Sequence, residues 1–526
     1  MALRLRCTKM VTFPEPHAAP LAPLRQPWRR LITVGRARDL TRHDLQAHLA
    51  WLQREVGYDA CRFHAVFHDD MRVVSRAADG TLRFNWREID LIYDTLLSLG
   101  LRPFVELNPM PAALASGAQT MFHYAMNVTP PRRWEEWHHL VHSFARHLVE
   151  RYGLAEVRRW HFEVWNEPNL PGFWSGTKED YFRLYAEAAR ALKNVDPQLR
   201  VGGPATSKAS WIGEFIATCQ KENWPLDFVS THLYPQDEQI EFPDRIGSPH
   251  PVGGYFAATV QTVKEVVARS ACPELPIHWT EWNTQAAASA SAVTWLKNPH
   301  VDDTFAATFI AKNCVALDDA CDSFGYWVAS DVFEENGLPT APLSCSYGLL
   351  TVHGLPKASA NAFRLLRRLT GERVPLALSV PHDGCGAVAT RDGASVRLLF
   401  WNHTHVELSA APPQWTDEIR VPWTGEARVI TARVGPRWGS VRDAWRSLGE
   451  PASLDPTQEE YLRQRSEPWW DFVHASTKEG ELTLPVALAP GELLFVEIRA
   501  EAAVAADGEL SSASHEWEQK MGDLSR

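Results

Sequence analysis

The run His161-Phe162-Glu163-Val164-Trp165-Asn166-Glu167-Pro168-Asn169 decides the fold of this chain. It is a short apolar and aromatic segment that ends in a glutamate, and the proline that follows takes the backbone out of regular strand pairing. The run Pro276-Ile277-His278-Trp279-Thr280-Glu281-Trp282-Asn283 has the same form. A glutamate at the end of a buried strand is costly to desolvate unless it has a partner or a chemical role. We therefore predict two strands that carry Glu167 and Glu281 to one functional site.

Short runs of this kind alternate with amphipathic segments from residue 31 to about residue 370. The predicted strands are Leu31–Val34, Ala60–Ala65, Arg102–Leu107, Arg159–Trp165, Arg200–Gly203, Asp227–His232, Pro276–Thr280 and Asp322–Val328. The predicted helices, which show the i, i+3, i+4 recurrence of half-buried helices, are Leu40–Glu55, Asn85–Leu99, Arg133–Tyr152, Lys178–Val195, Ala209–Lys221, Ala257–Ala268, Asp303–Leu317 and Ala358–Leu369. Eight strand-then-helix units predict a (β/α)8 barrel, the TIM-barrel fold. An open doubly wound sheet is the alternative, but it favours a GxGxxG turn, which this sequence lacks.

After residue 370 the apolar residues alternate with period two, which predicts the strands of an accessory β-sandwich. The predicted strands of this region are Gly386–Arg391, Ser395–Trp401, Ile419–Val421, Ala427–Ala432, Glu481–Val486 and Glu492–Ile498, with an N-terminal strand at Leu3–Val11 to complete the sandwich. The predicted domains are the barrel at residues 28–355 and the sandwich at residues 1–27 plus 356–500, with a short helical insertion near residues 440–475. Residues 501–526 are polar and predict a mobile tail.

The composition is that of an ordinary globular protein, with 45% hydrophobic and 22% charged residues among 526. The net charge of −11 argues against nucleic acid or an anionic membrane as the main partner. The sequence shows no apolar run near the roughly 20 residues of a membrane span and no signal-peptide segment, so we expect a cytoplasmic location. The eight cysteines form no CxxC pair or zinc-like spacing, and we expect neither a metal nor a cofactor.

Polar residues end six of the predicted strands at one edge, where the reacting groups of a (β/α)8 barrel lie. These residues are His64, Asn108, Asn166 with Glu167, His232 with Tyr234, Glu281, and Trp327 with Glu334 and Glu335 beyond it. A lone histidine on an apolar strand is more often a hydrogen-bonded core residue. However, six strands that all end in polar residues at one rim of a barrel are hard to obtain by chance.

Two carboxylates across a barrel mouth predict hydrolysis of a glycosidic bond, which needs one acid and one nucleophile or base. We expect Glu167, next to a second carboxylate, to have a raised pKa and to act as the acid. Glu281 is then expected to stay ionised, supported by a hydrogen bond from Tyr234. The alternative for each glutamate is a purely structural cap or ion pair.

Six segments resemble glycoside hydrolase family 39, a retaining family of clan A that contains β-xylosidases and α-L-iduronidases. The segments are Phe162–Leu170, Trp279–Thr284, Arg62-Phe63-His64, His68-Asp69-Asp70-Met71, Ser230-Thr231-His232-Leu233-Tyr234-Pro235, and Tyr326-Trp327 with Glu334 and Glu335. The resemblance covers roughly residues 30–370 and continues more weakly to about residue 500.

The resemblance implies a role for each matching residue. Glu167 would be the general acid/base and Glu281 the nucleophile. Asn166 would contact the sugar 2-hydroxyl, and His232 and Tyr234 would line the same pocket. The remaining implied contacts are Trp327 under the sugar ring or bonded through its indole N–H, Glu334 and Glu335 on outer hydroxyls, and His64 closing the pocket.

The family leaves a choice of substrate. The carboxylate of a uronic acid is bound best by an Arg or Lys side chain opposite it. Glu334 and Glu335 would instead accept hydrogen bonds from the hydroxyls of a neutral sugar. We therefore expect an exo-acting β-D-xylosidase on short xylo-oligosaccharides. An iduronidase stays open because Arg62 and Lys208 lie near strand ends, as does an arabinosidase. An endo-acting glycanase of the clan and a non-catalytic sugar-binding barrel are further alternatives. A monomer is favoured over a tetramer, and the sandwich is expected to brace the barrel rather than to bind sugar.

Overall fold

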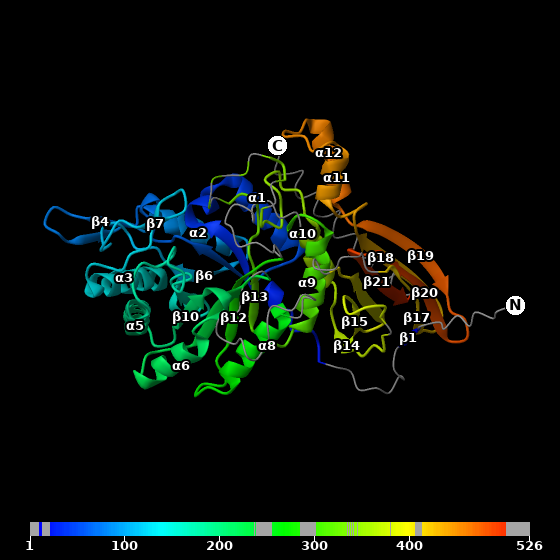
Figure 1. Ribbon diagram of the computed structural model, residues 1–526, viewed down its shortest axis with the longest axis horizontal. Coiled ribbons are helices and arrows are strands. Elements are labelled where there is room, and N and C mark those ends of the chain that lie inside the picture. The colour runs from blue at the N-terminus through cyan, green and yellow to red at the C-terminus, as the bar shows by residue number, and fades with distance from the viewer. Residues whose placement is uncertain are drawn as a thin grey trace, which may run out of the picture.

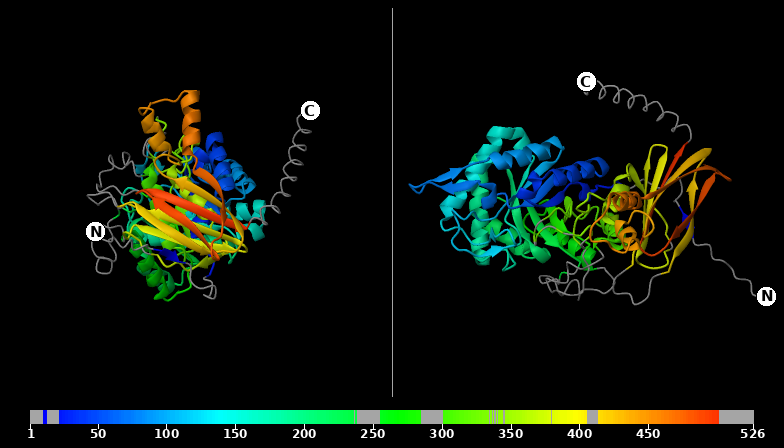
Figure 2. Two further views of the ribbon diagram at one scale, coloured as in Figure 1. Left: turned by 90° about the vertical axis from the view of Figure 1, so that its right-hand side faces the viewer. Right: turned by 90° about the horizontal axis from the view of Figure 1, so that it is seen from above.

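The computed structural model describes residues 10–12, 22–235, 237, 255–284, 301–333, 335, 337, 339, 341–343, 346–378, 380–404 and 413–500. Figure 1 shows a barrel wrapped in helices at one end of the long axis and antiparallel sheets at the other. The right-hand view of Figure 2 shows the same division, and the left-hand view, along the long axis, shows the sheets in front of the barrel with a helical pair (residues 441–466) above them.

Eight parallel strands close into a barrel in chain order, and the pairing of Tyr326 with Ile32 completes the ring. The strands are β2 (Ile32–Arg36), β3 (Ala60–His64), β6 (Arg102–Leu107), β9 (His161–Val164), β10 (Arg200–Thr206), β11 (Phe228–Leu233), β12 (Ile277–Trp282) and β13 (Ser323–Tyr326). Each predicted barrel strand is present, so the predicted fold class is confirmed.

One long helix follows each barrel strand. These helices are α1 (His43–Glu55), α2 (Arg87–Ser98), α3 (Trp134–Tyr152), α5 (Lys178–Val195), α6 (Ile212–Lys221), α8 (Tyr255–Ala268), α9 (Thr304–Ala316) and α10 (Ala358–Arg367). Helix α5 has the predicted bounds, because Thr177 accepts a hydrogen bond from the backbone of Asp180 and the Asp180 side chain bonds back in a capping box.

Shorter elements fill the connections. They are the hairpins β4 (Val74–Arg76) with β5 (Leu82–Phe84) and β7 (Thr120–Met121) with β8 (Met126–Asn127), helix α4 (Leu154–Val157), and 3-10 turns at Pro27–Arg29, Ala37–Thr41, Asp69–Met71 and Ser207–Ala209.

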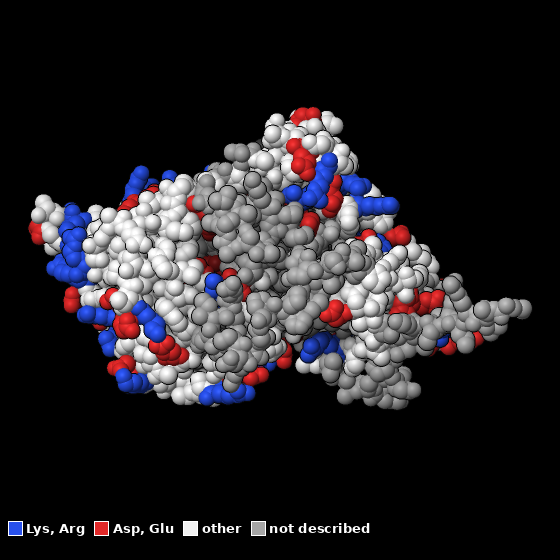
Figure 3. Space-filling model, viewed as in Figure 1, with Lys and Arg blue, Asp and Glu red and all other residues white. Residues whose placement is uncertain are grey.

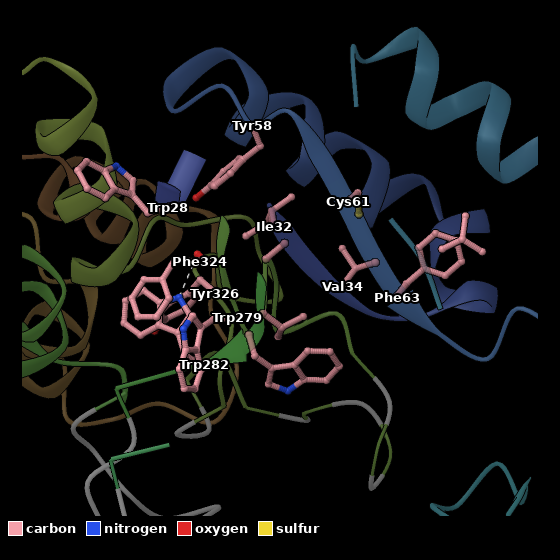
Figure 4. Close-up of a cluster of buried hydrophobic side chains, with 14 of the residues drawn as sticks. Trp28, Ile32, Val34, Tyr58, Cys61, Phe63, Trp279, Trp282, Phe324 and Tyr326 are labelled. Carbon is pink, nitrogen blue, oxygen red and sulfur yellow. Dashed lines mark hydrogen bonds between the residues drawn. The ribbon is translucent and has the colours of Figure 1, made fainter. Parts of the chain in front are cut away.

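The side chains of each barrel strand alternate between an apolar outer layer and the barrel interior. On β3, Cys61 and Phe63 belong to the buried core drawn in Figure 4. Arg62 and His64, the alternate residues, instead both bond to the carboxylate of Glu106 on β6. Two kinds of buried layer therefore meet at the barrel wall, one apolar and one charged.

Helix α10 covers the strands that close the barrel. Phe363 packs on Tyr326 with ring centroids 5.4 Å apart and on Trp282 at 6.3 Å. Trp282 stacks on Phe324 at 4.2 Å and its Nε1 donates to the Phe324 carbonyl at 3.1 Å (Figure 4). This helix lies beyond residue 355, where we expected the barrel to end.

The C-terminal part forms two sheets with a common core. The six-stranded sheet has the order β14 (Glu372–Val374), β15 (Cys385–Asp392), β16 (Ser395–Asn402), β21 (Glu492–Ala500), β18 (Glu426–Val434) and β19 (Trp469–Ser476), and the three-stranded sheet has the order β1 (Met10–Thr12), β17 (Trp415–Pro422) and β20 (Glu481–Leu488). Leu398 and Val496 of the large sheet share one buried cluster with Ile419 and Val486 of the small one. These sheets fit an accessory β domain.

The structure refines several predicted details of this part. Helices α11 (Val441–Ser447) and α12 (Pro456–Ser466) occupy the predicted insertion, but its end is strand β19. Of the predicted N-terminal strand, Met10 and Val11 pair with β17, while residues 3–9 and the predicted tail, 501–526, lie outside the described residues. The division into domains at residues 28–355 and 1–27 plus 356–500 stays a prediction.

The large sheet packs its other face against the barrel. Its residues Leu399, Ala432 and Phe495 belong to the same buried cluster as the barrel core. Thr308 Oγ1 of α9 lies 2.9 Å from His403 Nδ1, just beyond β16. Helices α9 and α10 therefore form a layer common to the two parts.

Charges of both signs are interspersed over the described surface in Figure 3. Among the helices that the structure describes, none is both long and apolar enough to cross a lipid bilayer.

Candidate active site

Glu167 leaves the barrel wall at the end of β9. Trp165 and Glu167 have φ values of +72° and +44°, a left-handed conformation that costs about 1–3 kcal/mol for such residues. The Glu167 amide donates to the carbonyl of Ala205 at 2.8 Å, which ties the turn to β10. Its carboxylate Oε1 lies 3.0 Å from Nδ1 of His232. The strained turn thus aims the Glu167 carboxyl group across the barrel mouth.

Glu281 lies on β12 and is held at both of its oxygens. Arg62 donates to Oε1 at 2.8 Å, and the Tyr234 hydroxyl donates to Oε2 at 3.0 Å. These two donors fix the orientation of the Glu281 carboxylate in the barrel mouth. The hydrogen bond that we predicted from Tyr234 is present.

The two glutamates lie close together around His232. A carboxylate oxygen of Glu167, a ring nitrogen of His232 and a carboxylate oxygen of Glu281 all lie within 4.8 Å of one another. Three such atoms have the spacing of a possible cation site. The guanidinium of Arg62 supplies a positive charge to one member of this group, Glu281.

Arg62 is the centre of a charged layer inside the barrel, and it is fully buried. Its Nε donates to Glu163 at 2.6 Å, and its Nη2 contacts Glu106 at 2.6 Å and Asn166 Oδ1 at 2.8 Å. With the contact to Glu281, four acceptors surround one guanidinium. A buried charge is tolerated only with such partners.

Sequence reasoning did not assign Arg62, Glu106, Glu163 or Thr280 to the site. Thr280 donates from its hydroxyl to Glu163 Oε1 at 2.8 Å and contacts His232 Nε2 at 3.1 Å. A signal was present, because three apolar strands each carry a charge at an interior position.

Burial separates the proton affinities of the site residues. It raises the pKa of Glu167 to about 7, while a hydrogen bond from Ser207 and the positive charges of Arg62 and Lys208 act to lower that pKa. Burial also lowers the pKa of His232 and that of His64 to about 4, so both rings are neutral near neutral pH.

The other predicted site residues lie around this pair. His64 bonds through Nδ1 to Glu106 at 2.9 Å and its ring packs on Trp327 with centroids 4.7 Å apart. Burial and the negative charges of Glu281 and Glu167 raise the pKa of Glu335 well above its usual value, which puts Glu335 near the pair. Glu334 lies outside the described residues. The predicted residues that the structure describes are thus brought to one place.

The sequence matches the family model described as glycosyl hydrolases family 39 over residues 14–483. A β-xylosidase from Caldicellulosiruptor saccharolyticus is 37% identical over 484 residues, which cover 90% of this chain and 95% of that protein. A β-xylosidase from Geobacillus stearothermophilus is 34% identical, with coverages of 90% and 92%. The crystal structure of a monomeric β-xylosidase from Caulobacter crescentus CB15 matches with a TM-score of 0.81 at 31% identity, covering 94% of this chain and 100% of that one.

Proposed function

Because this chain belongs to glycosyl hydrolase family 39, we propose that it is a retaining β-D-xylosidase that releases xylose from the non-reducing end of short xylo-oligosaccharides. The observation that supports this most is the carboxylate pair, whose nearest oxygens lie within 4.8 Å. Retaining glycosidases hold their two carboxyl groups about 5–5.5 Å apart, whereas inverting ones leave about 6.5–9.5 Å for a water.

The proposed reaction has two displacements. First, Glu281 attacks the anomeric carbon while the glycosidic bond breaks and Glu167 gives its proton to the leaving oxygen. The product of this step is a xylosyl ester on Glu281. Next, water attacks the same carbon, the ester bond breaks, and Glu167 takes a proton from the water. Both carboxyl groups return to their starting protonation states.

The surroundings of the pair favour a neutral sugar over a uronide. Arg62 is fully buried and already bonded to four neighbours, so it has no role left for a substrate carboxylate. Glu335, near both catalytic carboxyl groups, suits sugar hydroxyls. Lys208 is a cation near Glu167 that could pair with the carboxylate of an iduronide. The choice between xyloside and iduronide therefore needs a direct comparison of substrates.

The deciding experiment compares 4-nitrophenyl β-D-xyloside, α-L-iduronide, α-L-arabinoside and β-D-glucoside. We expect the xyloside to be hydrolysed with the highest kcat/KM, and an NMR time course to show β-xylose before mutarotation. First appearance of α-xylose would exclude the double displacement. A higher kcat/KM on the iduronide would move the proposed substrate to the uronides.

We also propose a monomer in a reducing compartment, the cytosol. The six described cysteines are free thiols, five of them buried, as is usual for reduced core residues. Light scattering coupled to gel filtration tests the monomer.

A further inference from the structure

A chain of hydrogen bonds runs through the barrel interior to the proposed acid. Arg62 Nε donates to Glu163 at 2.6 Å, and the other oxygen of Glu163 accepts from the Thr280 hydroxyl at 2.8 Å. Thr280 Oγ1 lies 3.1 Å from His232 Nε2. The opposite ring nitrogen, Nδ1, lies 3.0 Å from Glu167 Oε1. All these residues are buried.

The proton positions along this chain of hydrogen bonds follow from the ionisation state of Glu163. Burial acts to raise the pKa of Glu163, but the charge of Arg62 and the hydrogen bonds to the carboxylate together outweigh it and the net pKa is lowered, so Glu163 is ionised and accepts only. Thr280 has a single hydroxyl proton, which must therefore point to Glu163. The Thr280 oxygen is then free only to accept, and Nε2 of His232 must be its donor.

A neutral histidine carries one ring proton. If that proton is on Nε2, Nδ1 is an acceptor, and two acceptors 3.0 Å apart repel unless Glu167 carries a proton between them. We propose that Glu163 and Thr280 are positioning residues that hold His232 in its Nε2–H tautomer and thereby keep the acid proton on Glu167. The proposal rests on the proposed function only in naming Glu167 the acid.

The same arrangement serves both displacements. In the first, the unprotonated Nδ1 favours the neutral acid until the leaving oxygen takes its proton. In the second, the ionised Glu167 faces an acceptor instead of a donor, which makes it a stronger base toward water. One guanidinium thus supports Glu281 directly and Glu167 through three hydrogen-bonded residues.

Other groups face these residues and act on the same protons. Arg62 Nη2 lies 3.5 Å from His232 Nε2, but it already contacts Glu106 and Asn166 at shorter distances. Glu281 Oε2 lies 3.6 Å from Nδ1 of His232, which is farther than the 3.0 Å between this nitrogen and Glu167 Oε1. The titratable or charged groups that act electrostatically with Glu167 or His232 are His64, Arg62, Glu106, Glu163, Lys208, Tyr234, Asp237, Glu281, Glu335 and Tyr347.

The test is the Thr280→Val variant, which keeps the shape and removes the hydroxyl, beside Thr280→Ser, which keeps it. In Thr280→Val the His232 proton is free to move to Nδ1 and to donate to ionised Glu167. The Glu167 pKa then falls, and the alkaline limb of kcat/KM moves to lower pH by about one unit. Thr280→Ser should keep the wild-type limb.

A second readout does not depend on activity. In protein labelled with 15N-histidine, the signal missing from His232→Gln identifies the ring, and its two nitrogen shifts report the tautomer directly. We expect Nε2–H in the wild type and in Thr280→Ser, and Nδ1–H in Thr280→Val. A wild-type proton on Nδ1, or a tautomer and pH limb unchanged in Thr280→Val, would overturn the proposal. Lack of xyloside turnover with the Nε2–H tautomer intact would instead count against the proposed function.

Discussion

At the scale of single residues, Glu167 and Glu281 differ in what removal of the carboxyl group should leave behind. Glu281→Ala loses the atom that attacks carbon, so we expect turnover of an aryl xyloside to disappear. Added azide fills the space and attacks from the same face, which gives the α-xylosyl azide. In Glu167→Ala the rate of hydrolysis of a xyloside with a poor leaving group should fall by about 10²–10⁴-fold, and added azide should then give the β-xylosyl azide. The two products are distinguished by NMR, and exchanged products would reverse the roles.

The pH dependence follows from the raised pKa of Glu167, about 7. The first displacement needs the protonated form, so kcat/KM for a xyloside with a poor leaving group should fall as pH rises through about 7. A dinitrophenyl leaving group needs little protonation, and its alkaline limb should flatten. Rates with both substrates across pH 5–9 provide the measurement. An equally steep limb with both would assign that pKa to another group.

The positions of the two glutamates were predictable because each ends an apolar strand, and the strand ends of a barrel converge. The hydrogen bonds and ion pairs that surround the two glutamates could not be predicted. The sequence indicates only that Arg62 is a cation near a strand end. The closed barrel shows that it is surrounded by Glu106, Glu163 and Glu281. Pairing across strands far apart in sequence has no local signature.

At the scale of elements, the barrel strands and helices were predictable because their apolar periodicity is strong. Strand β19 was missed because most of its residues are exposed, so apolar residues do not alternate along it. Strand β14 is only three residues long and carries little pattern. Local sequence predicts elements that bury one face, and it fails where an edge strand buries little.

The close approach of β10 and β11 gives a prediction for Gly202. A Cβ atom there would lie 2.4 Å from the carbonyl oxygen of Phe228, which is backbone of the neighbouring strand. Gly202→Ala must push the strands apart, and we expect it to lower the unfolding free energy by about 1–3 kcal/mol. Gly213→Ala is the control, because its Cβ would meet only Val266 at 3.5 Å and alanine favours helix α6. Urea denaturation measures both, and equal stabilities would mean that the strands yield freely.

At the scale of the whole molecule, the sheets share helices α9 and α10 with the barrel, so the C-terminal part is expected to stabilise the barrel mechanically. Asn361 of α10 is fully buried and donates to the carbonyls of Gly439 at 3.1 Å and Ser466 at 2.7 Å. Its oxygen accepts from Arg364 at 2.9 Å. One side chain therefore joins the barrel helix to both ends of the α11–α12 segment.

Asn361→Ala should lower the unfolding free energy by about 1–3 kcal/mol, because it leaves buried carbonyl groups unpaired. If the C-terminal part braces the barrel, hydrogen exchange should also rise in β13 and α10. The KM for the xyloside should stay unchanged, because the hydrogen-bond partners of Asn361 given above are not site residues. Gln464→Ala removes an exposed hydrogen bond to Glu460 on α12 and serves as the matched control. Faster exchange confined to α11 and α12, with β13 as protected as in the wild type, would show that the barrel holds its closing strand without the bracing contact.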